Sequence, residues 1–300
     1  MTLEEQIKHY RKQAGLSQEK MAEKIGVSRQ AVTKWETGTG TPDIANLMAI
    51  AELFQISVDE LLSNEKTEKV QTNYIYESHV EYDIDGKKNY DIGLGGAHTV
   101  VLRAYEGEKI KVSSLSNVIH DLSADYKIKI DDNKNGIDVD MRRFNEATES
   151  LAKEGLVVHI LLPIKYIGKI ELAVNAKKVE IYDIENELIE LNGKISEVTL
   201  QGNKSEIEID SNLDMQIHVV SHRGFIELNQ ISATSRLVVP LDYSFRAAKK
   251  GIATNVMFEK QGNKVENFSD PDADNYIEFN GMKSELVIVA DEMESEAGNH

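Results

Sequence analysis

The segment LSQEKMAEKIGVSRQAVTKWETG, from Leu16 to Gly38, has the pattern of two short helices joined by a glycine turn. Ser17 and Ser28 each precede a run with apolar residues at helical spacing, and a serine in that place caps the first turn of a helix. Gly26 lies between the two runs and can adopt the left-handed conformation that ends a helix. We therefore predict one helix that begins after Ser17 and a second one over residues 28–37.

The second of these helices has two faces of different chemistry. Val32 and Trp35 fall on one side and are expected to be core residues. The other side carries four side chains that can form hydrogen bonds, namely Arg29, Gln30, Thr33 and Lys34. Arginine pairs with guanine O6 and N7, and glutamine with adenine N6 and N7, so this face suits base contact in the major groove of DNA. Ser17, Gln18 and Ser28 lie at helix N-termini, where they are expected to contact DNA phosphates.

Helical patterns continue on both sides of this pair. Residues 2–14 are predicted to form an amphipathic helix, and Thr-Pro-Asp at 41–43 to open a fourth helix with proline at its first position. The residues that this fourth helix is expected to bury are Ile44, Leu47, Met48, Ala51 and Phe54. Ser57 and Glu60 form a capping box for a fifth helix. Residues 1–63 are therefore predicted to be a small all-α domain of five helices.

The distribution of charge favours DNA as the partner of this domain. The whole chain has a formal net charge of −17. A negative charge of this size opposes DNA binding, because the contact between a protein and DNA phosphates is mainly electrostatic. Residues 8–35, however, contain seven basic and only two acidic residues, for a local net charge of +5. The positive charge therefore coincides with the predicted helix pair, and the acidic charge lies mostly elsewhere.

Residues 3–62 resemble the phage-repressor-like (XRE) helix-turn-helix domain of bacterial transcriptional regulators. The matching positions are Arg11, Gly15 to Gln18, Ala22, Gly26 to Ser28, Val32, Trp35, Glu36, Gly38 and Pro42 to Leu47. The resemblance covers about a fifth of the chain. It implies an ion pair between Arg11 and Glu36, phosphate contact from Gln18, and base contact from Arg29, Gln30, Thr33 and Lys34.

Four positions are expected to have structural roles in this domain, namely Arg11, Gly26, Trp35 and Glu36. The loop at 37–41, TGTGT, lacks the basic residue that relatives often carry there for the DNA backbone. This departure favours a dimer that binds two half-sites over one domain that binds alone.

A polar stretch at 64–73 is interpreted as a linker to an all-β repeat domain at 74–300. One series of strand-like triplets begins at Ile170, Ile189, Ile207 and Ile226, with spacings of 19, 18 and 19 residues. A second series begins at Val179, Val198, Ile217 and Leu237, with spacings of 19, 19 and 20 residues. A single two-strand unit cannot bury its apolar face, whereas stacked units can. The repeat predicts a β-solenoid or β-roll, with a β-sandwich as the alternative.

This region also resembles adhesin-like β domains of unknown function. The resemblance lies in Leu162-Pro163, in the repeated strands and in residues 281–286. It implies a fold without implying a chemistry.

No catalytic or metal-binding pattern stands out in the sequence. The absence of cysteine excludes disulfides and thiolate metal sites. The glycine-rich segment 91–96 lacks the full dinucleotide-binding spacing and predicts a turn or bulge. We therefore expect no enzymatic activity, no cofactor and no bound metal. The N-terminus does not have the pattern of a signal peptide, and no apolar run could span a membrane, so the expected location is the cytoplasm, at the nucleoid.

Two functional hypotheses follow from these patterns. The first is a sequence-specific bacterial transcription regulator that binds operator DNA as a homodimer through the helix at 28–37. The β domain at 74–300 would then serve oligomerisation or the sensing of a protein or small-molecule effector. The alternative is a protein-interaction or antitoxin-like module whose DNA binding is only autoregulatory.

Overall fold

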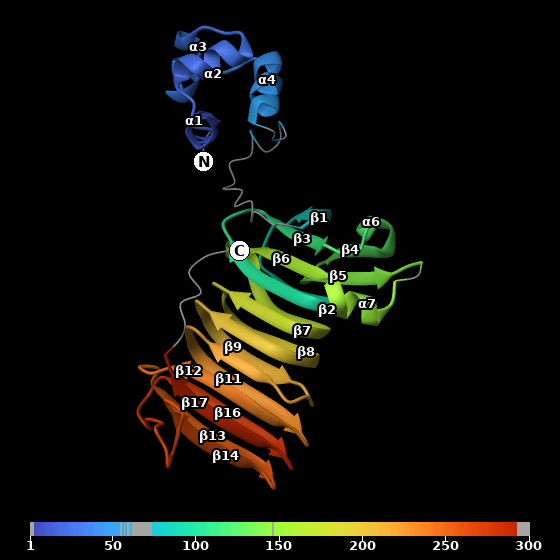
Figure 1. The fold of residues 1–300 in the computed structure, drawn as a ribbon, viewed down its shortest axis with the longest axis vertical. Helices are drawn as coiled ribbons and strands as arrows, with labels where there is room; N and C mark the ends of the chain where they lie inside the picture. Colours follow the sequence, from blue (N-terminus) through green and yellow to red (C-terminus); the bar gives the residue numbers. More distant parts are fainter. Residues whose placement is uncertain are drawn as a thin grey trace. The chain divides into compact units, whose positions relative to one another are not determined.

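The chain divides into two compact units, Met1–Gln71 and Thr72–His300. A computed structural model describes residues 3–54, 56, 58, 61, 74–145 and 147–292. The first unit is a small helical domain, and the second is a large β-rich domain (Figure 1). The linker predicted over 64–73 lies outside the described residues. No helix in the described part of the chain is long and apolar enough to cross a lipid bilayer.

The described residues of the first unit contain four α-helices, namely α1 (Leu3–Gln13), α2 (Gln18–Ile25), α3 (Arg29–Glu36) and α4 (Ile44–Phe54). The side chains of Ser17 and Ser28 cap α2 and α3, and each accepts a backbone hydrogen bond at 3.1 Å. Gly26 has a φ of 73° and closes α2 in the left-handed conformation. These caps confirm the predicted starts of α2 and α3 and the predicted turn between them.

The start of α4 differs from its prediction. Asp43 caps this helix, because its Oδ1 accepts a hydrogen bond from Asn46 N at 2.8 Å. Pro42 therefore precedes the helix and does not occupy its first position. The fifth helix, predicted from Ser57 and Glu60, lies mostly outside the described residues. Within that stretch, Leu61 is fully buried against the helical core.

The buried face of α4 was also predicted in part wrongly. Leu47, Ile50 and Ala51 are the buried residues of this helix. Ile44 and Met48, which were expected in the core, are 77% and 60% exposed. The spacing of apolar residues correctly predicted a helix here. Packing against the neighbouring helices, however, determines which part of its broad apolar stripe faces the core.

In the β-rich domain, the described residues form 17 strands. Their bounds are β1 (Tyr76–Asp83), β2 (Lys88–Tyr105), β3 (Lys109–Ser116), β4 (Tyr126–Asn133), β5 (Gly136–Arg143), β6 (Val157–Pro163), β7 (Ile167–Tyr182), β8 (Glu185–Gln201), β9 (Asn203–Asp210), β10 (Gln216–Val219), β11 (His222–Ile231), β12 (Thr234–Pro240), β13 (Phe245–Ile252), β14 (Asn255–Lys260), β15 (Asn263–Val265), β16 (Asn275–Met282) and β17 (Glu285–Asp291). Short helical segments interrupt them at α6 (Leu122–Asp125), α7 (Glu149–Gly155) and η1 (Ile164–Tyr166).

The two repeated series seen in the sequence lie in register in this domain. Parallel pairing of β7, β8, β9 and β11 aligns Ile170, Ile189, Ile207 and Ile226. Parallel pairing of β7, β8, β10 and β12 aligns Val179, Val198, Ile217 and Leu237. All eight side chains are buried in one hydrophobic core. The repeat of about 19 residues therefore stacks its apolar face from unit to unit.

The order of strands in space departs from the order along the chain near the C-terminal end. β16 pairs with β11 on one side and with β13 on the other, and β17 lies in the same way between β12 and β14. The last pair of long strands is thus inserted between two pairs that precede it in sequence (Figure 1). The repeat analysis did not predict this insertion, because spacing along a chain does not record which units become neighbours.

Glycines mark two irregular points in the strands. The predicted bulge at 91–96 is confirmed, because the register of β2 with β7 shifts between Gly93 and Gly95. Gly193 in β8 has a φ of 134°, and a Cβ added there would lie 2.0 Å from Val174 O. Only glycine fits this position, where neighbouring strands approach closely.

Buried His222 makes the stability of the β-rich domain depend on pH. The residue is 4% exposed, and burial lowers its pKa to about 4, although a backbone hydrogen bond at Phe225 opposes the shift. An unfolded histidine has a pKa near 6.5, so the unfolded chain takes up the proton first as the pH falls. The stability contributed by the neutral ring is complete above about pH 6.5 and is lost toward about pH 4.

We predict that, between neutral pH and about pH 4, the free energy of unfolding falls by about 3 kcal/mol more in the wild type than in His222→Leu. Urea unfolding followed by far-ultraviolet circular dichroism at a series of pH values measures both proteins. The many carboxylates titrate in both proteins. The difference between the two curves of unfolding free energy against pH therefore gives the contribution of His222. Parallel curves would contradict the prediction.

Candidate nucleic-acid interface

α3 presents the face that was predicted to contact bases. Arg29, Gln30 and Lys34 are exposed, whereas Val32 and Trp35 are 0% and 7% exposed in the core of the helical domain. The polar side chains of α3 therefore lie on its solvent side. That arrangement suits a helix that enters the major groove.

Thr33, the fourth predicted base contact, lies between the two faces of α3. It is half-buried, and its hydroxyl lies 3.1 Å from Gln18 Oε1 and 3.0 Å from Arg29 O, both of which are acceptors. The hydroxyl is thus engaged within the domain. The Thr33 methyl group remains for contact with a base, and the C5-methyl of thymine is its natural partner.

A buried ion pair joins α1 to the end of α3, and this is the pair that the family resemblance implied. Arg11 Nε and Nη2 donate to the two carboxylate oxygens of Glu36 at 2.5 and 2.9 Å. The two side chains are 11% and 2% exposed. Burial raises the pKa of Glu36, but hydrogen bonds from Arg11 and Gln18 lower it by more, so the pKa lies below its usual value. A bidentate pair of this kind fixes the orientation of one helix relative to the other.

Gln18 links this ion pair to the exposed face of α3. Its Nε2 donates to Glu36 Oε2 at 2.8 Å, and its Oε1 accepts from Thr33. The resemblance implied only a phosphate contact for Gln18, and no local pattern signals the link, because Glu36 lies 18 residues further along the chain. The second N–H of the amide remains for a phosphate.

We predict that Gln18→Ala lowers the free energy of unfolding of the helical domain by about 1–3 kcal/mol, because the buried carboxylate of Glu36 loses one of its hydrogen bonds. The fluorescence of Trp35, the only tryptophan, reports unfolding of this domain in urea. Gln13→Ala changes an exposed glutamine of α1 and is the matched control, with an expected loss below about 0.5 kcal/mol. Equal losses in the two variants would contradict the role of Gln18.

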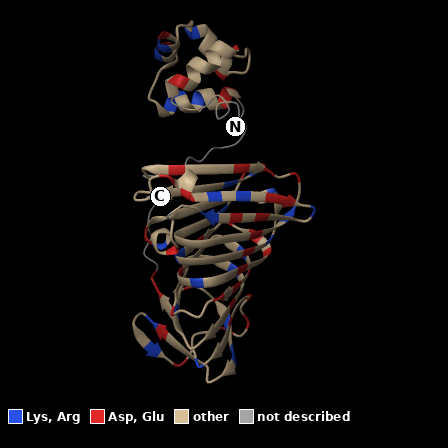
Figure 2. Cartoon of the chain, turned by 90° about the vertical axis from the view of Figure 1, so that its right-hand side faces the viewer, with Lys and Arg blue, Asp and Glu red and all other residues tan. Residues whose placement is uncertain are grey.

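The remaining candidate residues lie around this face. Ser17 and Ser28 are exposed, and each Oγ accepts a backbone N–H while its own proton stays free to donate to a phosphate. All seven basic residues of segment 8–35 lie on α1, α2 or α3. Figure 2 shows the basic and acidic residues of the helical domain. The helix N-termini and the basic side chains could together hold a DNA backbone.

A row of carboxylates crosses neighbouring strands of the β-rich domain, and Glu278 at the end of the row is only 4% exposed. Neighbouring parallel strands align Glu171, Glu190, Glu208, Glu227 and Glu278. Acidic residues on successive strands are visible in Figure 2. Burial raises the pKa of Glu208, and the charges of Glu227, Asp210 and Glu190 raise it further. Among the described residues, no group of three or more His, Asp or Glu side chains is arranged to hold a metal ion.

The helical domain is similar to known helix-turn-helix proteins. A family model described as helix-turn-helix matches residues 7–61. The chain is 41% identical over 66 residues to the HTH-type transcriptional activator BcrR of Enterococcus faecalis. The aligned residues are 22% of this chain and 32% of that protein. The chain is also 37% identical over 71 residues to the cryptic phage CTXphi transcriptional repressor RstR of Vibrio cholerae. Here the aligned residues are 24% of this chain and 63% of that protein. The chain therefore spans less than two thirds of the length of either relative.

Two further similarities concern a short relative and a solved structure. An uncharacterised HTH-type transcriptional regulator of Methanocaldococcus jannaschii is 32% identical over 66 residues, which are 22% of this chain and 100% of that protein. A crystal structure of a candidate adhesin from Bacteroides fragilis matches 72% of this chain and 98% of that chain, with a TM-score of 0.41 and 11% identity. This last likeness says nothing about what the β-rich domain binds.

Proposed function

Since this chain belongs to the helix-turn-helix family of transcriptional regulators, we propose that it binds specific operator sites in double-stranded DNA. The observation that carries the proposal is the exposed polar face of α3, which the buried pair of Arg11 and Glu36 holds in place. The proposed activity is regulation of transcription by site-specific binding, without catalysis.

Each side chain of the interface has a proposed contact. Arg29, Gln30 and Lys34 would hydrogen-bond base edges in the major groove, and Thr33 would contact a thymine methyl group. Phosphates would be held by the residues at the N-termini of α2 and α3, namely Ser17, Gln18 and Ser28. Bases supply specificity in this scheme, and phosphates supply position.

We further propose that the protein binds as a homodimer in the cytoplasm, at the nucleoid. The loop at 37–41 has no basic residue, which limits the phosphate contacts that one domain can make. Two half-sites double the number of contacts and add a second reading helix.

The β-rich domain is proposed to be a β-solenoid that serves oligomerisation or the sensing of a signal or partner. The parallel pairing of β7, β8, β9 and β11 supports a solenoid, because the sheets of a β-sandwich are antiparallel. Stacked units expose long rows of side chains on a rigid surface, and such surfaces suit ligand or partner binding.

Selection of DNA sites by the purified full-length protein tests the function. We predict enrichment of a palindromic site whose half-site centres lie about one helical turn, ~34 Å, or a multiple of it apart. Enrichment of one non-palindromic site would contradict the dimer while leaving site-specific binding intact. No enrichment at low salt would contradict the proposed function itself.

A further inference from the structure

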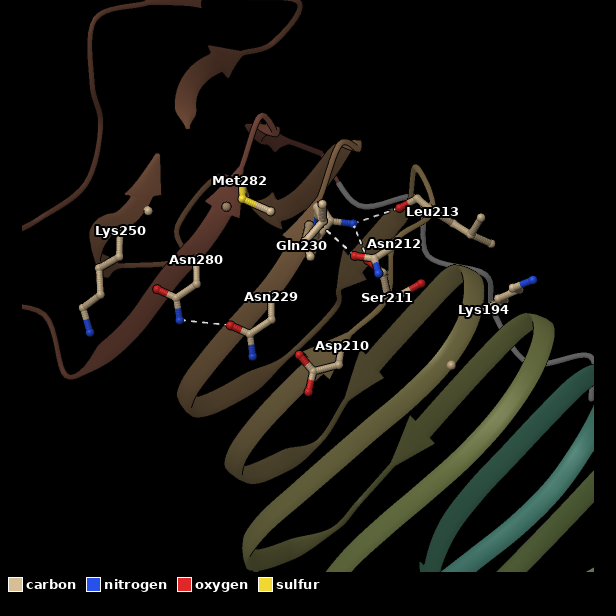
Figure 3. A pocket seen from close by; sticks show the side chains of 14 residues that line it. Lys194, Asp210, Ser211, Asn212, Leu213, Asn229, Gln230, Lys250, Asn280 and Met282 are labelled. Atoms are coloured by element: carbon tan, nitrogen blue, oxygen red, sulfur yellow. Dashed lines mark hydrogen bonds between the residues drawn. The ribbon is translucent and has the colours of Figure 1, made fainter. Parts of the chain in front are cut away.

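A groove of about 620 Å³ runs across the outer surface of β9, β11, β16 and β13 (Figure 3). One wall is a row of polar side chains in register on these strands, namely Asp210, Asn229, Asn280 and Lys250. The other wall is apolar and includes Ile231 and Met282, which are paired in register. Between the walls lie Gln230, which is buried, and Gly281 and Gly251, which have no side chains. The volume is in the range of small-molecule sites.

The apolar wall is unusually exposed for residues of this type. Ile231 and Met282 are 48% and 45% exposed, and Ile252, in register with Met282, is 76% exposed. Single exposed apolar residues need no explanation, but a row of them beside a groove indicates a binding surface. The ligand of such a surface has an apolar part.

The hydrogen-bond donors of the polar wall are engaged within the domain. Lys250 Nζ donates to Glu278 at 2.7 Å, and Asn229 Nδ2 donates to Glu208 at 2.9 Å. Asn280 Nδ2 donates to its neighbours as well, whereas Asn280 Oδ1 has no hydrogen-bond partner. Gln230, which also lines the groove, is 3% exposed, and its Oε1 has no partner either. These two oxygens are buried, so the exposed carboxylate of Asp210 is the acceptor of this wall that a ligand in the groove can reach.

The electrostatics of the groove favour a positive charge. Asp210 is exposed, and its carboxylate has no ion-pair partner among the described residues. It lies beside the carboxylate row, where Glu208 already senses the charges of Glu190 and Glu227. Two lysines line the groove: Lys250 is paired with Glu278, and Lys194 extends away from Asp210 and Asn229 (Figure 3).

From this arrangement we propose that the groove binds an amphipathic cation, a primary alkylammonium ion with its head group at Asp210 and its alkyl chain over Ile231 and Met282. Strands lie about 4.8 Å apart and rise about 3.3 Å per residue, so the Cα atoms of Asp210 and Met282 are about 12 Å apart. A medium-length alkyl chain spans that distance. An ammonium group donates hydrogen bonds and accepts none, which matches the exposed carboxylate of Asp210. If the β-rich domain senses a signal, as proposed above, this ligand would be that signal, and this part of the inference rests on the proposed function. The binding of the ligand to the groove does not depend on it.

Titration of the full-length protein, labelled with ¹³C at its methionine methyl groups, tests the proposal in the absence of DNA. The probes are n-octylammonium chloride, n-octanol and sodium octanoate, which share a chain and differ in charge. The Met282 methyl signal should shift and saturate with n-octylammonium at a Kd about two- to fivefold lower than with n-octanol. Octanoate should bind most weakly. No saturable shift, or tighter binding of octanoate, would overturn the proposal.

Three variants locate the site. Asp210→Asn should abolish the preference for n-octylammonium over n-octanol. Ile231→Ser should weaken the binding of both ligands by about three- to tenfold. Ile164→Ser is the matched control, because Ile164 is 45% exposed outside the groove, and it should change neither Kd. Circular dichroism checks that each variant is folded. A preference that survives in Asp210→Asn would overturn the assignment. Because DNA is absent, failure here would leave operator binding untouched.

Discussion

Arg11→Ala is expected to lower the free energy of unfolding of the helical domain by about 3–5 kcal/mol. Arg11 makes a bidentate contact with Glu36, whose side chain is only 2% exposed. Without Arg11, the carboxylate stays buried with Gln18 as its remaining side-chain donor. Removing one partner of a buried ion pair costs far more than the pair itself contributes, because the other charge is left uncompensated. Against a typical stability of 5–15 kcal/mol, the loss is severe.

Urea unfolding followed by Trp35 fluorescence measures this loss. The control is Lys20→Ala, which removes an ion pair with Glu23 in which both side chains are more than 60% exposed. The control should cost less than about 1 kcal/mol. The double variant Arg11→Met, Glu36→Leu should regain most of the stability, because neither charge is then buried alone. If Arg11→Ala were no less stable than Lys20→Ala, the ion pair would not hold α3 in place.

What the sequence predicted well depends on short-range chemistry. Ser17, Gly26 and Ser28 determine where α2 and α3 begin and end through contacts within a few residues, and the structure contains those contacts. The repeat in the β-rich domain was also legible, because stacked units with one apolar face must repeat that face along the chain. The aligned isoleucines of β7 and β8 show the result.

What the sequence did not predict depends on which distant segments become neighbours. The predicted stripe of α4 correctly included Leu47 and Ala51. It also included Ile44 and Met48, which are exposed, and it left out Ile50, which packing in the domain buries. The insertion of β16 between β11 and β13 likewise has no periodic signal. Within the candidate site, the exposed face of α3 was predictable from helical spacing. The link from Gln18 to Glu36 was not, because it closes only after α2 and α3 have packed.

Replacing Arg29 and Gln30 together by alanine is expected to remove about 2–6 kcal/mol of specific DNA binding, since each well-formed bidentate base contact is worth about 1–3 kcal/mol. Specific affinity should therefore fall by roughly 30-fold to 10⁴-fold. Non-specific binding should change little, because it depends on phosphate contacts, which the variant keeps. Both side chains are exposed on α3, so the fold should be preserved.

Competition binding with the selected site and with a scrambled site, at fixed salt, measures the ratio of specific to non-specific affinity. Lys24→Ala is the matched control, because Lys24 is an exposed basic residue of α2 outside the predicted base-contacting face. A lost phosphate contact weakens both sites equally, so the control should leave the ratio unchanged. If the double variant kept the ratio as well, α3 would not be the helix that reads the operator. The ion pair between Arg11 and Glu36 would then contribute only to the stability of the domain.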